Sequence, residues 1–108
     1  MAEKTFINTT DYELVVDLTV RRGETPGQAG RPVNFKMLPH TESQIPYGEN
    51  KDPYLDGILV KATWDGSMIA ATAQTTTRGS RVDRAMNMND HVIVATAQDS
   101  LVLNFQNG

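Results

Sequence analysis

The sequence predicts a single all-β domain over residues 1–108, folded as an antiparallel β-sandwich with an immunoglobulin-like or jelly-roll-like arrangement. The expected number of strands is about eight or nine. Three observations support this prediction. Apolar and polar residues alternate with the strand period of two, turn-forming residues interrupt the runs at short intervals, and no segment carries a convincing helical stripe. A chain of 108 residues suits one domain with one hydrophobic core.

The alternation is clearest in four runs, at residues 12–20, 32–38, 58–64 and 101–105. Each run places its apolar residues on one face and most of its polar residues on the other. An antiparallel sheet with one buried face requires this pattern. The predicted core therefore consists of Phe6, Tyr12, Leu14, Val16, Leu18, Val20, Val33, Phe35, Ile58, Val60, Trp64, Ile69, Val92, Val94, Leu101, Leu103 and Phe105.

Turn signals separate the runs. The Asp65–Gly66 pair is the kind favoured in tight hairpins, and Gln98 to Ser100 forms another break. The glycine-rich segment 22–31 is expected to be the most disordered, because it lacks apolar anchors that would offset its ordering entropy. The best helix candidate is VDRAMNM at 82–88, which lacks a clean pattern from cap to cap.

The composition excludes several classes of function. The net charge is −3 and the basic residues are scattered, which argues against nucleic acid as a partner. The absence of cysteine excludes disulfides, thiolate chemistry and cysteine-type zinc sites, and no cofactor is expected. No apolar run is long enough to span a membrane, and MAEKTFINTT shows no signal peptide. A cytoplasmic location is the default expectation, with export by another route left open.

Catalysis is not expected. The two histidines, His40 and His91, lie in no recognisable catalytic motif, and no phosphate-binding or nucleophile signature is present. A hydrolase would need one of these histidines beside a carboxylate in a pocket, which the sequence alone does not place. Surface histidines are the simpler interpretation.

The stretch YGENKDPYLDGI at 47–58 is the main candidate for a ligand site. Its first interpretation is a fixed corner between strands, stiffened by Pro53. The second is a lectin-like or calcium-assisted carbohydrate site, because sugar sites on β-sandwiches commonly pair aromatic side chains with acidic loop residues, and calcium prefers several oxygen ligands from one flexible loop. The ligand-binding candidates are Tyr47, Asp52, Tyr54, Asp56, Trp64 and Asp65, and the metal candidates are Glu49, Asp52 and Asp56.

Assembly is the other candidate function. The segment TAQTTT at 72–77 is uncharged, free of proline and glycine, and rich in threonine. Such a strand at a sheet edge can pair with another chain, and a central strand facing solvent on one side is the equally weighted alternative. The preferred prediction is a non-enzymatic binding or assembly module that self-associates through sheet edges as a homo-oligomer. A protein or a carbohydrate is the further partner considered.

Three stretches in the middle third of the chain, FKMLP (35–39), YGEN (47–50) and DPYLDGI (52–58), carry a resemblance to a family. They resemble small uncharacterised bacterial β-sandwich proteins, whose pattern is F-x-L-x-P, then Y-G, then N-P-Y-L-N-G-I. Met37 and Asp52 depart from that pattern. The resemblance implies the sandwich fold and a bacterial origin, and it implies no activity or site.

Overall fold

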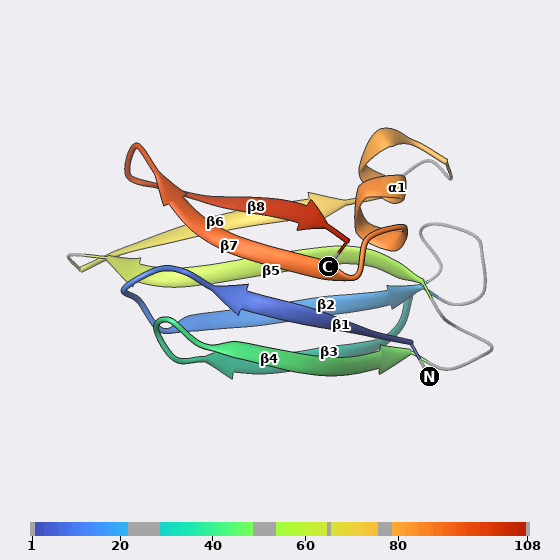
Figure 1. Cartoon of the computed structure of the whole chain (residues 1–108), viewed down its shortest axis with the longest axis horizontal. Coiled ribbons are helices and arrows are strands. Elements are labelled where there is room, and N and C mark those ends of the chain that lie inside the picture. Colours follow the sequence, from blue (N-terminus) through green and yellow to red (C-terminus); the bar gives the residue numbers. More distant parts are fainter. Residues whose placement is uncertain (1, 22–28, 49–53, 65, 76–78, 108) are drawn as a thin grey trace.

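The computed structural model describes residues 2–21, 29–48, 54–64, 66–75 and 79–107. In this part of the chain it shows eight strands and one helix, which confirms the predicted all-β sandwich (Figure 1). The elements are β1 (Ala2–Asn8), β2 (Leu14–Arg21), β3 (Ala29–Met37), β4 (Glu42–Gly48), β5 (Leu55–Trp64), β6 (Ser67–Gln74), α1 (Arg81–Asn87), β7 (His91–Ala97) and β8 (Ser100–Gln106).

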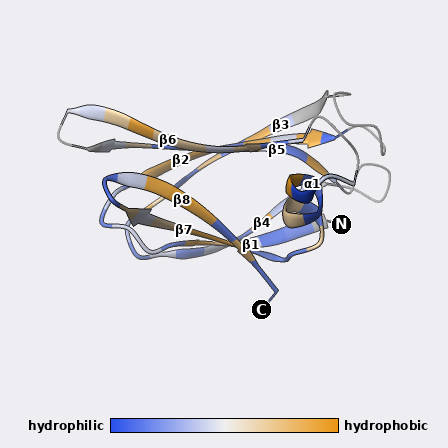
Figure 2. Ribbon diagram, turned by 90° about the horizontal axis from the view of Figure 1, so that it is seen from above, coloured by the Kyte–Doolittle hydropathy of each residue, from blue (hydrophilic) through white to orange (hydrophobic). Residues whose placement is uncertain are grey.

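The strands form two four-stranded sheets that pack face to face (Figure 2). One sheet has the order β4-β1-β7-β8 and the other has the order β3-β2-β5-β6. All neighbouring strands are antiparallel except β1 and β7, which run parallel. The outer strands β3 and β4 therefore lie on one side of the sandwich, and β6 and β8 lie next to each other on the opposite side.

The core lies between the sheets, where the period-two pattern places the apolar side chains. Phe6 of β1 meets Phe35 of β3 edge to face, with ring centroids 5.1 Å apart. Every predicted core side chain that the structure describes belongs to the core or packs against it, which confirms the prediction. Six of these side chains are only partly buried, and Tyr12 and Phe35 are two of the six. The side chain of Trp64 lies outside the described part. The core also contains Met37, Tyr47, Leu55, Ala62, Ala73 and Met86, which the prediction left out.

Two connections follow the turn chemistry of the sequence. Gly66 has φ of +78° in the two-residue link between the paired residues Trp64 and Ser67, which confirms the predicted hairpin. Gln98 and Asp99 both have positive φ in the β7–β8 hairpin, although neither is glycine. Left-handed backbone at both central residues matches the twist of a two-residue hairpin.

Several predicted boundaries were wrong. Leu55 and Asp56 lie in β5, which begins three residues earlier than the predicted run at Ile58. The predicted strand at 72–77 ends at Gln74, and 76–78 lie outside the described residues. Most of the segment expected to be disordered, 22–28, also lies outside them, while β3 already begins at Ala29. No helix in the described ranges is both long and apolar enough to cross a membrane.

The helix α1 lies at one end of the sandwich, in the connection between β6 and β7 (Figures 1 and 2). Ser80 caps it, and its side-chain oxygen accepts a hydrogen bond from Asp83 N at 3.3 Å. The sequence Ser80-Arg-Val-Asp83 has the spacing of a capping box, which is the local signal that identifies the start of this helix. Met86 is fully buried and attaches the helix to the core.

Candidate functional site

A buried ionic cluster lies under α1, with Arg21 at its centre. Arg21 Nε donates to Asp56 Oδ1 at 2.9 Å, and Arg21 Nη2 donates to Asp83 Oδ1 at 2.7 Å. Arg21 Nη2 also donates to the carbonyl of Leu55 at 3.2 Å. The side chain of Arg21 is 3% exposed, that of Asp56 8% and that of Asp83 10%. Water therefore contributes little to balancing their charges. One guanidinium therefore joins β2, β5 and α1.

Local irregularities in the chain bring these residues together. Arg21 ends β2 just after a register shift against both neighbouring strands, so its side chain leaves the regular alternation. Its backbone N–H donates to the carbonyl of Tyr54 at 2.8 Å, and its guanidinium lies 5.8 Å from the Tyr54 ring centroid. Asp83 occupies the first turn of α1, where an acidic side chain is favoured by the exposed N–H groups.

The charges in this cluster stabilise one another. Burial works against the Arg21 cation, but hydrogen bonds and charge attraction from Asp83 and Asp56 outweigh it and raise the pKa of Arg21. Burial likewise works against the Asp83 carboxylate, but hydrogen bonds from Gly79 N, Arg21 and Asn87 outweigh it and lower the pKa of Asp83. Arg21 and Asp83 are therefore charged at neutral pH.

Asn87 completes the connection between α1 and β5. Its Oδ1 accepts from Leu55 N at 2.7 Å, and its Nδ2 donates to Leu55 O at 3.0 Å and to Asp83 Oδ1 at 2.8 Å. The amide thus pairs with the backbone of Leu55 much as a neighbouring strand would. These groups bond mainly to one another, so we interpret the cluster as a structural junction.

A second buried cation, Lys4, lies at the same end of the molecule. It points inward from β1, is 4% exposed, and donates from Nζ to the carbonyl of Asn89. Its ammonium lies 5.7 Å from the ring centroid of Tyr47. A hollow of about 370 Å³ adjoins it, lined by Glu3, Lys4, Tyr47, Asn87, Met88, Asn89, Asp90 and Asn107.

Burial changes the acid–base properties of both side chains in this contact. It lowers the pKa of Lys4 from 10.5 to about 8, against the opposing attraction of Asp90. It also raises the pKa of Tyr47 from 10.0 to about 12. The amine therefore exchanges protons near physiological pH, while the phenol stays neutral.

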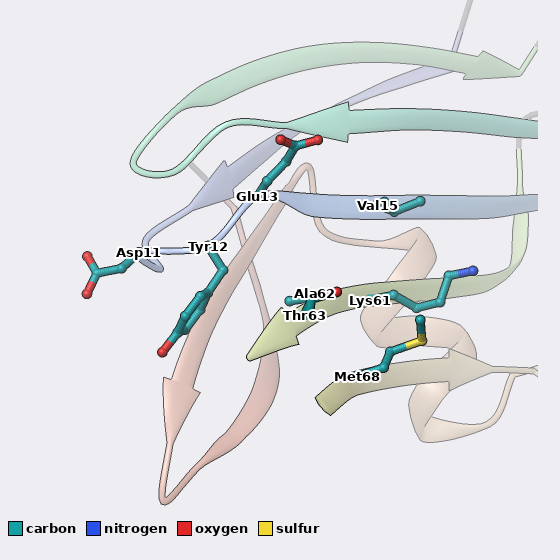
Figure 3. Close-up of a pocket in the computed structure, with 8 residues that line it drawn as sticks. All are labelled: Asp11, Tyr12, Glu13, Val15, Lys61, Ala62, Thr63 and Met68. Atoms are coloured by element: carbon teal, nitrogen blue, oxygen red, sulfur yellow. The ribbon is translucent and has the colours of Figure 1, made fainter. Parts of the chain in front are cut away.

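A larger groove, of about 470 Å³, lies at the opposite end of the sandwich (Figure 3). Asp11, Tyr12 and Glu13 form one wall at the start of β2, and residues of β5 together with Met68 of β6 form the other. Figure 3 shows the carboxylates of Asp11 and Glu13 pointing in different directions, so they do not converge on a common ligand position. Lys61 in this groove is 3.5 Å from Asp17, which balances its charge.

The predicted ligand residues that the structure describes are not gathered into one site. Tyr47 is in the core beside Lys4, whereas Tyr54 lies against Arg21. The two tyrosines line separate hollows that share Asn87 and Met88. Asp56 is buried in its ion pair with Arg21.

The remaining candidates, Glu49, Asp52, Asp65 and the side chain of Trp64, lie outside the described residues. The carbohydrate and calcium site therefore stays a prediction. In the described ranges, no group of three or more His, Asp or Glu side chains could hold a metal ion.

Both histidines lie beside carboxylates, but at the surface. His40 Nε2 is 2.6 Å from Asp11 Oδ1, with side chains 61% and 84% exposed. His91 Nδ1 is 2.7 Å from its neighbour Asp90 Oδ1. Neither histidine lines the hollows described above. In the described part of the chain, the side-chain hydrogen bonds of both histidines go to carboxylates and not to a hydroxyl group that could act as a nucleophile.

The two sides of the sandwich differ in how their edge strands are protected. On one side, β3 contains Pro32 and Lys36, and β4 contains Glu42 and Pro46. On the other side, β6 (SMIAATAQ) and β8 (SLVLNFQ) contain no charged residue, proline or glycine. In the described part of the chain, β6 pairs only with β5 and β8 only with β7.

No family model, curated protein or solved structure matches the chain.

Proposed function

We propose that the protein is a non-enzymatic module that self-associates through its sheet edges, on the side formed by β6 and β8. The observation that supports this proposal is the composition of these two strands, which carry none of the residues that usually block edge pairing. The opposite side provides an internal reference, because its strands carry proline and charged residues. Pairing is therefore favoured on one side and disfavoured on the other.

The exposure of β6 adds to this contrast. Its side chains at Met68, Ala70, Thr72 and Gln74 are exposed on the outer face of the sheet, and Met68 is 69% exposed. The ladder between β5 and β6 runs without a bulge from Gly57↔Gln74 to Trp64↔Ser67. A regular edge with uncharged side chains offers a continuous row of backbone donors and acceptors to a second copy. Antiparallel pairing about a two-fold axis would extend the sheet across both copies.

The test compares Thr72→Lys in β6 with Gln44→Lys in β4. Both positions are exposed and lie on outer strands, so each substitution adds one lysine to one edge. Two-fold pairing through β6 would bring two lysines close together in the first variant only. We expect light scattering across a concentration series to show association that Thr72→Lys weakens by roughly tenfold or more, which corresponds to about 1.4 kcal/mol. Gln44→Lys is expected to associate like the unmodified protein.

A monomer at high concentration would overturn the proposal, and equal weakening by both lysines would remove the assignment to β6. The absence of cysteine allows a further measurement of orientation. Single cysteines at 68, 70, 72 and 74 can carry spin labels. Antiparallel pairing predicts label distances that pass through a minimum and change by about 14 Å for each two-residue step, whereas parallel stacking predicts a constant distance.

A further inference from the structure

Lys4 is a primary amine held inside the fold beside a hollow, and neither the core nor the proposed self-association uses it. Its Nζ has two close neighbours, the Asn89 carbonyl and the Tyr47 ring, and both residues line the hollow of about 370 Å³. The amine therefore lies at the wall of this hollow. The volume is within the range of small-molecule sites.

The environment of Lys4 differs from that of Arg21, although both cations are buried at the same end. Arg21 forms two short ion pairs with buried carboxylates. Lys4 faces one backbone carbonyl, one aromatic ring and the exposed Asp90, which itself contacts His91. Glu3, the other charged residue lining the hollow, is the neighbour of Lys4 on β1 and is exposed. The carbonyl, the ring and Asp90 each favour the ammonium, but burial outweighs them and lowers the pKa of Lys4, which increases the share of the neutral, nucleophilic amine.

We infer that Lys4 is a nucleophile for small hydrophilic carbonyl compounds, which it binds as a Schiff base in this hollow. The nitrogen lone pair attacks the carbonyl carbon, and the carbonyl oxygen takes up a proton to give a carbinolamine. The amine loses its proton to solvent, and the carbinolamine then expels its hydroxyl as water. The sum is amine plus aldehyde giving imine plus water, with no oxidant or reductant. Asn89 and Asn107 also line the hollow, and their amides can form hydrogen bonds beyond those to Ala85 O and Asp90 N, which suits a ligand that carries hydroxyl groups.

The experiment uses the unmodified chain with glyceraldehyde as the carbonyl probe and cyanoborohydride to trap the imine. Peptide mapping by mass spectrometry then compares labelling at Lys4 with labelling at Lys36 and Lys61. We expect Lys4 to be labelled at least tenfold faster near neutral pH, because each unit by which a pKa falls gives about ten times more free amine. The rate at Lys4 should rise with a midpoint near pH 8, whereas ordinary lysines follow a midpoint of about 10.4.

Two controls separate this property from simple accessibility. The preference for Lys4 should disappear in urea, where all lysines are exposed to the same solvent. Lys4→Arg, which keeps the charge and has no primary amine, should remove the fast-labelled site while leaving the circular dichroism spectrum unchanged. If Lys4 is labelled more slowly than Lys36 and Lys61 in the folded protein, the inference fails, and Lys4 is a sheltered structural lysine. A preference that persists in urea would also overturn it.

Discussion

The two ends of the sandwich are closed by different kinds of polar contact. At the end opposite α1, the buried amide of Asn8 is fully bonded to neutral groups: Nδ2 donates to the carbonyls of Tyr12 and Leu38, and Oδ1 accepts from Thr10 N and Thr10 Oγ1. At the α1 end, the buried polar contacts are made by charged side chains. Arg21 is paired with Asp56 and Asp83, and Lys4 donates to the carbonyl of Asn89. Most buried polar groups are satisfied at both ends, although Thr75 Oγ1, beside Asp56 at the α1 end, has no hydrogen-bond partner among the described residues.

Because of this difference, the two ends should respond differently to pH. A neutral network has no proton to gain or lose between acid and alkaline conditions, so its contribution to stability should not vary with pH. The charged end contains groups whose pKa values are shifted by folding, and each shift couples stability to pH. The pH-dependent part of the stability should therefore come from the α1 end.

The largest expected effect comes from Arg21→Met. This substitution leaves Asp56 and Asp83 buried without their cation, and breaking a buried pair in this way costs about 3–5 kcal/mol. Urea unfolding measures the change. Arg84→Met provides the matched control, because Arg84 is on the exposed face of α1, and its loss should change the free energy of unfolding by less than about 0.5 kcal/mol. Similar losses in the two variants would contradict the structural role of the cluster.

A smaller loss, of about 2–3 kcal/mol, is expected for Asn8→Ala. The change leaves the Thr10 N–H and two carbonyls without their partner in a buried site, and each unsatisfied group carries a desolvation penalty. The loss should be the same across the pH range, since no charge is involved. Unfolding curves at acid, neutral and alkaline pH test this, and a loss that varies with pH would break the contrast between the two ends.

Sequence patterns were sufficient for the parts of this fold that depend on local alternation. The faces of β2, β5 and β7 follow from period two, and the Asp65–Gly66 hairpin follows from turn chemistry. The pairing of β1 with β7 could not be predicted, because it joins segments more than eighty residues apart. The ionic cluster was missed for the same reason, since Arg21, Asp56 and Asp83 have no shared local pattern. The burial of Tyr47 and Asp56, both named as ligand-binding candidates, could not be predicted either, because it depends on long-range contacts.

Asp83→Asn should cost about 2 kcal/mol at neutral pH, because it replaces a charged hydrogen-bond acceptor of Arg21 with a neutral one. The folded pKa of Asp83 is below its ordinary value of 3.8. The carboxylate therefore contributes stability above that value, and this contribution is lost as the pH falls through the folded pKa. The stability difference between the two proteins should accordingly shrink in acid, as measured by thermal unfolding. A difference that is constant with pH would show that Asp83 is not protonated in step with unfolding.

The smallest effect at neutral pH, and the sharpest test of the charged end, is expected for Lys4→Met. Replacing a buried cation by an apolar side chain of similar length is often neutral or stabilising, so the change at pH 7 should stay within about 1 kcal/mol.

The unmodified protein releases the Lys4 proton at about pH 8 when folded and at 10.5 when unfolded. Between these values the unfolded chain binds more protons, so the free energy of unfolding should rise with pH. Lys4→Met should lack this rise, and subtracting its curve removes the titration of every other group. If the free energies of unfolding of the two proteins change with pH in parallel, folding leaves the amine in a water-like environment. That result would contradict the contrast between Lys4 and Arg21, and it would also contradict the assignment of Lys4 as a nucleophile.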